Sequence, residues 1–192
     1  MFFAAGMEMD DQDAWKGWLA AVTRMLASLG PAERHAWKLT ADRVRSHKER
    51  LSELTAAPGA AALCSACRGA CCAGGKHHLT PLDLLVSLAA GNPPLTPRFH
   101  DLPCPYLDRS GCRMAPEFRP FPCLSFVCEA IDGRFSTAQQ ALIQQAEAEL
   151  REIYRELAAV HGEWLTRGLF LAPVSPLPSR LFPSGGSHER CP

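Results

Sequence analysis

The residues of this chain that could do chemistry are its cysteines. The sequence has 192 residues and nine cysteines, and eight of the nine lie between positions 64 and 128. Thiolates are soft ligands, which select zinc or an iron–sulfur cluster over magnesium or calcium. The clustering therefore predicts a metal-binding protein. The candidate ligands are Cys64, Cys67, Cys71, Cys72, Cys104, Cys112, Cys123 and Cys128.

The first four cysteines form a box that reads Cys64-Ser-Ala-Cys67-Arg-Gly-Ala-Cys71-Cys72. Two-residue spacing lets both thiolates of a tight turn face one ion, and nearby glycines allow the backbone to wrap a metal. Adjacent side chains diverge, so Cys71 and Cys72 would be strained on one tetrahedral ion. They would serve two metals, or only one would be a ligand. Eight cysteines can fill two four-thiolate sites or hold one cluster with four left over, and the choice between zinc and iron–sulfur stays open.

Disulfide bonds and simple packing are the other roles open to these cysteines. A reducing cytosol does not readily keep four disulfides, and packing accounts for single buried cysteines better than for eight at these spacings. Cys191 lies in a segment rich in Pro, Ser and Gly, and we do not expect it to be a ligand. His77 and His78 could complete a zinc site, but with eight cysteines nearby we assign them to a surface loop.

Other residues of the cysteine segment would support a metal site. Basic side chains would offset thiolate charge through N–H···S bonds, and they are Arg68, Lys76, Arg109, Arg113 and Arg119. Aromatic side chains would cover the site as a small core, and they are Tyr106, Phe118, Phe121 and Phe126. Asp83 needs no chemical role, because its position three residues after Thr80 explains it as a helix cap.

The ordered series of eight cysteines resembles the YkgJ-type cysteine-cluster family, a zinc- or iron-chelating domain with a CxxCxxCC box. The matching features are the opening box, Thr80-Pro81-Leu82-Asp83, Cys104-Pro-Tyr-Leu, Gly111-Cys112, Arg119-Pro120-Phe-Pro-Cys123 and Cys128. The box departs from the family pattern, because three residues rather than two separate Cys67 from Cys71. The resemblance implies metal chelation. The box is also similar to one in flagellin lysine methylases, which are associated with an iron–sulfur cluster, but no methyl-donor motif is recognisable here.

The flanking segments predict a mainly α fold in which helices at both ends clamp an irregular cysteine-rich segment. Residues 10–56 are expected to form a helical pair, because apolar residues recur at three- and four-residue steps. Its second helix carries the stripe of Trp37, Val44 and Leu51. A long helix over 136–168 is expected to begin at Ser136, end at Gly168 and pack on this pair. Its stripe is Leu142, Ala146, Leu150, Ile153, Leu157, Val160 and Trp164.

The remaining segments show little periodicity. Residues 57–128 are expected to be irregular and metal-binding, with a single helix that begins at Thr80-Pro81 and ends at Gly91. No strand is predicted. Residues 169–192 are rich in Pro, Ser and Gly and are expected to form an extended or disordered tail.

Composition narrows the function classes. The chain has 20 Lys and Arg against 20 Asp and Glu, which argues against a basic nucleic-acid-binding arm. No apolar stretch approaches the roughly 18 residues of a membrane helix. The first residues also lack the basic region of a secretory signal. We therefore expect a cytoplasmic protein that binds neither membrane nor nucleic acid, and the sequence indicates no particular protein partner.

These observations favour a protein that holds zinc or an iron–sulfur cluster through cysteine thiolates. One alternative is an iron–sulfur redox enzyme or electron-transfer protein. Another is an interaction module whose docking surface is shaped by the metal. The sequence contains no Ser-His-Asp order, HExxH, Walker loop or dinucleotide glycine pattern. No catalytic residue is therefore assigned, and whether the protein is an enzyme stays open.

Overall fold

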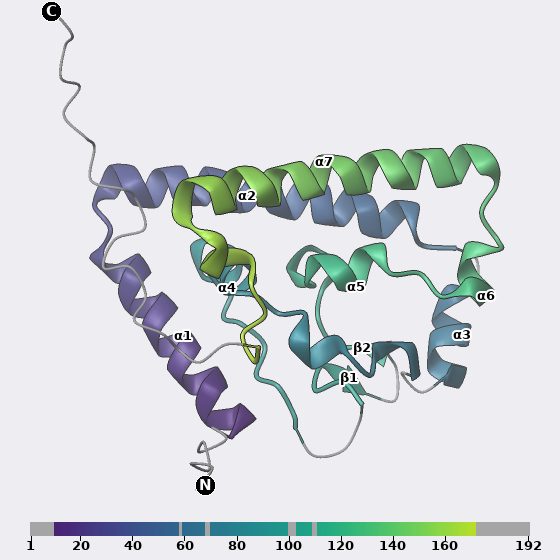
Figure 1. Cartoon of the computed structure of the whole chain (residues 1–192), viewed down its shortest axis with the longest axis horizontal. Helices are drawn as coiled ribbons and strands as arrows, with labels where there is room; N and C mark the ends of the chain where they lie inside the picture. The colour runs from purple at the N-terminus through teal and green to yellow at the C-terminus, as the bar shows by residue number, and fades with distance from the viewer. Residues whose placement is uncertain (1–9, 58, 68–69, 100–102, 109–110, 172–192) are drawn as a thin grey trace, which may run out of the picture.

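The computed structural model describes residues 10–57, 59–67, 70–99, 103–108 and 111–171. Over these residues the protein is mainly helical, which confirms the fold class predicted from the sequence. The three long helices are α1 (Asp11–Ser28), α2 (Pro31–Leu54) and α7 (Thr137–His161). Figure 1 shows α2 and α7 side by side and antiparallel, with α1 slanting away from the end of the pair where α2 begins. None of the described helices is both long and apolar enough to cross a membrane.

Helices α2 and α7 begin where the sequence predicts, and side-chain hydrogen bonds cap both starts. Ser136 Oγ accepts a hydrogen bond from the N–H of Gln139, and Gln139 Oε1 accepts one from the N–H of Ser136, which together form a capping box. Helix α2 begins at Pro31, and the N–H of the preceding Gly30 donates to the Glu33 carboxylate at 2.7 Å. These bonds satisfy donors that a helix leaves open at its start.

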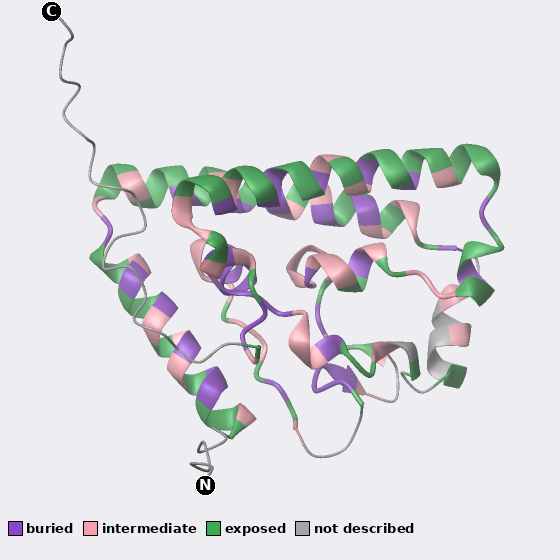
Figure 2. Ribbon diagram, viewed as in Figure 1, coloured by how far each residue is buried: buried purple, intermediate pink, exposed green. Residues whose placement is uncertain are grey.

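Apolar stripes on the long helices form the core (Figure 2). On α2 the predicted stripe of Trp37, Val44 and Leu51 is fully buried. On α7 the predicted stripe is wrong at two positions, because Leu142 and Val160 are 46% and 55% exposed. The buried face of α7 consists of Ile143, Ala146, Leu150, Ile153, Tyr154 and Ala158. The buried face thus includes Tyr154, a residue that the predicted stripe left out.

The end of α7 also differs from the prediction. The sequence placed the helix end at Gly168, whereas α7 ends at His161 and Gly162 follows with φ +102°. With ψ at 153° as well, Gly162 lies in a backbone region that essentially only glycine adopts, and the helix does not continue through it. The 3-10 helix η4 (Glu163–Thr166) then packs against both α7 and the shorter helix α4 (Pro81–Ala89).

The segment between α2 and α7 is more regular than predicted. The sequence predicted only α4, but the segment also contains α3 (Ala60–Cys67), α5 (Phe121–Ser125) and α6 (Glu129–Asp132). Its other elements are η1 (Ala70–Cys72), η2 (Gly75–His77), β1 (Leu107–Asp108), β2 (Gly111–Cys112) and η3 (Pro116–Phe118). The alanines that begin α3 have high helix propensity, which the expectation of an irregular segment overlooked. Helices this short depend on tertiary contacts for their stability.

The residues that follow η4 contact the core. Leu169, which we expected at the start of an extended tail, is fully buried. Its N–H donates to the carbonyl oxygen of Leu79 at 2.8 Å, and its own carbonyl accepts from Trp18 Nε1 at 3.0 Å. These bonds join the chain after α7 to α1 and to the residues before α4. The expected tail from residue 172 onward, with Cys191, lies outside the described residues.

Gly168 allows this close approach. A Cβ atom at this position would overlap the carbonyl oxygen of His77 and lie 3.1 Å from Leu171. We expect Gly168→Ala to lower the free energy of unfolding by about 1–3 kcal/mol, because a methyl group there forces backbone segments apart. Urea denaturation followed by circular dichroism measures the change. Gly133→Ala is the control, since a Cβ at Gly133 meets only an ordinary contact, and equal losses in the two variants would contradict the prediction.

Candidate metal centre

The candidate ligands lie on separate short elements of the cysteine segment. Helix α3 contains Cys64 and Cys67, and η1 contains Cys71 and Cys72. The others are Cys104 before β1, Cys112 in β2, Cys123 in α5 and Cys128 before α6. The side chains of Cys64 and Cys71 lie outside the described part of the structure. The geometry below therefore concerns the other six cysteines.

A short hairpin brings Cys112 back toward Cys104. Strands β1 and β2 are antiparallel, and Cys112 is paired with Leu107. The N–H of Leu107 donates to the carbonyl oxygen of Cys104 at 3.1 Å, which makes a turn just before the hairpin. Past the strands, the N–H of Arg113 donates to the carbonyl oxygen of Tyr106 at 2.8 Å. Two cysteines that are eight positions apart in the sequence therefore reach the same end of the hairpin.

Gly75 lies directly against the thiol of Cys104. Both residues are buried, and a Cβ atom on Gly75 would lie 2.8 Å from Cys104 Sγ. Real Cβ atoms almost never approach a neighbour this closely, so a side chain at Gly75 would displace the thiol. Helix η2 follows the first cysteine box, and the contact therefore joins that box to the hairpin.

His78 joins a third element to this region. Its Nδ1 atom lies 3.4 Å from Cys123 Sγ of α5. Burial lowers the pKa of His78 below its usual value, and the neighbouring His77 contributes to the shift. A lowered pKa favours the neutral imidazole, which is the form that binds metals. Sequence analysis assigned both histidines to a surface loop, and His78 departs from that assignment because it is half-buried beside a thiol.

The thiols near Cys123 influence one another electrostatically. Burial raises the pKa of Cys104 above its usual value, and the charge of Cys112 adds to the shift. The pKa of Cys123 is raised as well, first by the protein atoms around its thiol, although the residue is exposed at the surface. Nearby negative charges add to this second shift, and they belong to Cys104, Cys112, Asp83 and Cys72. Cys123 is thus within electrostatic reach of three thiols from three other elements.

The two remaining described cysteines lie on another pair of elements. Cys67 is exposed at the end of α3, and Cys128 is half-buried before α6. Helix α3 packs against both α6 and β2, which places these cysteines beside the hairpin region. Among the described residues, no group of three or more His, Cys, Asp or Glu side chains has a geometry that could hold a metal ion. The described part of the structure therefore contains no closed ligand set.

The residues expected to support the thiols make other contacts. Lys76 pairs with Asp11 of α1 at 2.7 Å, and Arg119 Nε donates to the carbonyl oxygen of Met114 at 3.0 Å. Phe126, expected to cover the site, is 61% exposed, so that expectation is wrong. The other aromatic residues are buried or half-buried, and they are Tyr106, Phe118 and Phe121. Arg68 and Arg109 lie outside the described residues.

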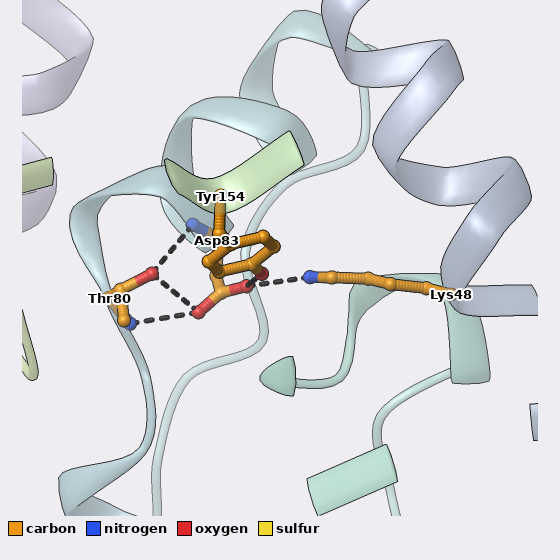
Figure 3. Close-up of polar contacts among 4 residues, drawn as sticks. All are labelled: Lys48, Thr80, Asp83 and Tyr154. Carbon is orange, nitrogen blue, oxygen red and sulfur yellow. Dashed lines mark hydrogen bonds and ion pairs between the residues drawn. The ribbon is translucent and has the colours of Figure 1, made fainter. Parts of the chain in front are cut away.

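Sequence analysis missed a buried polar cluster centred on Asp83, which contacts Thr80, Lys48 and Tyr154 (Figure 3). Asp83 begins as the predicted cap: its Oδ2 accepts from the N–H and the hydroxyl of Thr80 at 2.9 and 2.7 Å. Its Oδ1 accepts from Lys48 Nζ of α2 at 2.6 Å and from the hydroxyl of Tyr154 of α7 at 3.0 Å. One carboxylate therefore ties α4 to both long helices, in addition to capping its own helix.

Charge balance explains why this cluster is stable in the interior. The side chains of Lys48 and Asp83 are 0% and 1% exposed. An isolated buried charge would be very costly, whereas a paired and fully hydrogen-bonded one is tolerated. Burial and the negative charge of Asp83 raise the pKa of Tyr154 well above its usual value, so the phenol keeps its proton and donates. The cluster fixes α4, and with it the first residues after the cysteine box.

No protein-family model, curated protein or solved structure significantly matches this chain. The similarity of its cysteine series to the YkgJ-type family therefore stays a prediction.

Proposed function

We propose that this protein binds zinc or an iron–sulfur cluster through thiolates of its cysteine segment. The observation that supports this most is the 3.4 Å contact between His78 Nδ1 and Cys123 Sγ, at a thiol whose pKa is also raised by the charges of Cys104, Cys112 and Cys72. Four thiols from four elements have no common role in an apolar core, and soft metal ions prefer such donors. The close contact of Gly75 with Cys104 Sγ also supports the proposal, because a residue without a side chain is needed there to leave space for the sulfur.

The residues present fit the metals named. Zinc takes four thiolate or imidazole ligands, and iron–sulfur clusters are held by four thiolates. His78, in contact with Cys123, could replace one thiolate in a zinc site. A bound metal would cross-link short elements that bury little apolar surface of their own. Thiolate ligands must stay reduced, and we therefore propose a cytoplasmic location.

Metal analysis of protein purified without oxygen tests the proposal. We expect zinc or iron at about one equivalent or more per chain, since tightly held structural metals survive purification. Acid-labile sulfide and visible absorption would identify an iron–sulfur cluster, and a colourless protein with zinc would identify a zinc site. Less than about half an equivalent of any soft metal would contradict the proposal.

Single substitutions locate the ligands. Cys104→Ser and Cys123→Ser should each remove most of the bound metal, because serine is a poor ligand for soft ions. Gly75→Ala keeps every thiol and should also lower metal content, since its Cβ would displace Cys104 Sγ. Cys191→Ser is the matched control and should bind as much metal as the unaltered chain. Equal metal content in all four variants would refute this choice of ligands.

A further inference from the structure

A small pocket lies beside α4, and Asp83 is one of the residues that line it. Its volume is about 220 Å³, and it is formed by α4, the chain after it and the residues from Arg113 to η3. That volume corresponds to about seven water molecules. Most of its wall is apolar, and the apolar residues include Leu79, Leu84, Pro94, Leu95, Met114 and Phe118. The size and lining suit a small organic molecule rather than a bare ion.

Arg113 brings a positive charge to this wall. Its Nη1 atom is buried and has no hydrogen-bond partner among the described residues. No ion pair of Arg113 is found in the described part of the chain. Buried donors are normally paired. Arg113 therefore contributes to the pocket wall a charged side chain that still lacks one acceptor.

Asp83 also lines the pocket but cannot supply that acceptor. A carboxylate offers about four lone-pair sites. Lys48 and Tyr154 donate to Oδ1, and both donors of Thr80 bond to Oδ2, so these sites are filled. Since Lys48 also balances the charge of Asp83, no described carboxylate compensates the charge of Arg113 at the pocket. The pocket is therefore suited to an anion and unsuited to a cation.

We propose that this pocket binds a small organic acid, in which one carboxylate pairs with Arg113 and a short apolar body contacts the surrounding wall. Arg–carboxylate pairs are among the stronger hydrogen-bonded contacts, because both partners are charged and the guanidinium can form two parallel bonds. The apolar residues would exclude water from this pair. The inference does not depend on the metal proposal, since none of its contacts involves a thiol.

Titration by two-dimensional NMR with simple acids tests this inference. The probes are benzoate, phenylacetate and pentanoate, with the corresponding neutral amides as matched controls. We expect saturable shifts for at least one acid, confined to residues 79–95 and 113–118, and no saturation by its amide. Arg113→Met should weaken binding about tenfold or more. Arg98→Met, which removes an exposed arginine outside the pocket, should bind as the unaltered chain does.

A second variant guards against misfolding of Arg113→Met. Ala115 lines the pocket and is exposed, so Ala115→Trp should obstruct the pocket while keeping the arginine. No saturable binding by any of the three acids would overturn the inference. Equal binding of acid and amide would also overturn it, as would full-strength binding by the two pocket variants. Metal is measured in the same samples, and metal-free protein that binds an acid would contradict the metal proposal while supporting this one.

Discussion

Replacing Lys48 by methionine should lower the free energy of unfolding by about 3–5 kcal/mol, because it leaves the Asp83 carboxylate buried without its counter-charge. Methionine fills the same space as the lysine stem, so little packing is lost. The Nζ–Oδ1 distance is 2.6 Å, and among the described ion pairs this is the one in which both side chains are completely buried. Urea denaturation followed by circular dichroism measures the loss.

An exposed ion pair provides the control for this prediction. Arg43 of α2 pairs with Glu156 of α7 at 2.8 Å, but both side chains are about half exposed. Arg43→Met should therefore cost less than about 1 kcal/mol. The double variant Lys48→Met with Asp83→Asn should recover part of the lost stability, since no buried charge then stays unpaired. If Lys48→Met costs no more than Arg43→Met, the buried pair does not stabilise the fold as argued.

Removing the proposed metal should loosen the cysteine segment before the long helices. Elements between α2 and α7 are short, and ordering costs about 1–2 kcal/mol per residue for the backbone. Structural zinc contributes roughly 10 kcal/mol or more in small domains, which is enough to account for much of that order. Limited proteolysis of the chelated protein, followed by mass spectrometry, should show the first cuts between about residues 72 and 128.

The same digestion of metal-loaded protein is the control, and it should leave this segment intact for longer. Helix α7 should resist cleavage in both samples, since its apolar face packs on α2. First cuts within Thr137–His161, with the cysteine segment intact, would show that the metal does not order these elements. Identical digestion with and without chelator would contradict the proposed coupling as well.

The long helices could be predicted from the sequence because their signals are local. Caps such as Ser136 with Gln139, and the stripe through Trp37 and Leu51, need no knowledge of the rest of the chain. Lys48 is the instructive failure on α2. Lys48 lies four residues after Val44 and three before Leu51, so its spacing places it on the buried stripe. Its charge, however, predicts a position on the exposed face of the helix. Its partner Asp83 is 35 positions away, and only tertiary packing brings the two together.

The sequence likewise identifies the cysteines as candidate ligands, but it does not predict which of them lie close together in space. Spacing alone does not place Cys123 of α5 near Cys104, because their separation depends on the hairpin and on how α5 docks. His78 beside Cys123 was missed for the same reason. Leu169 was assigned to a tail on the basis of the Pro-rich residues after it. It is buried, and its N–H donates to the carbonyl oxygen of Leu79, which is 90 positions earlier in the chain.

The contact between α3 and α6 has a consequence for the rate at which the chain folds. Pairing of α2 with α7 closes a loop of about 80 residues, and each doubling of loop length costs about 0.6 kcal/mol in closure entropy. Once α3 has docked on α6, the path between the long helices shortens to about 20 residues, which lowers this cost by about 1.2 kcal/mol. Early docking of these two short helices would thus speed assembly nearly tenfold. Any ligand that holds α3 and α6 together would act as a folding accelerator for helices that it never touches.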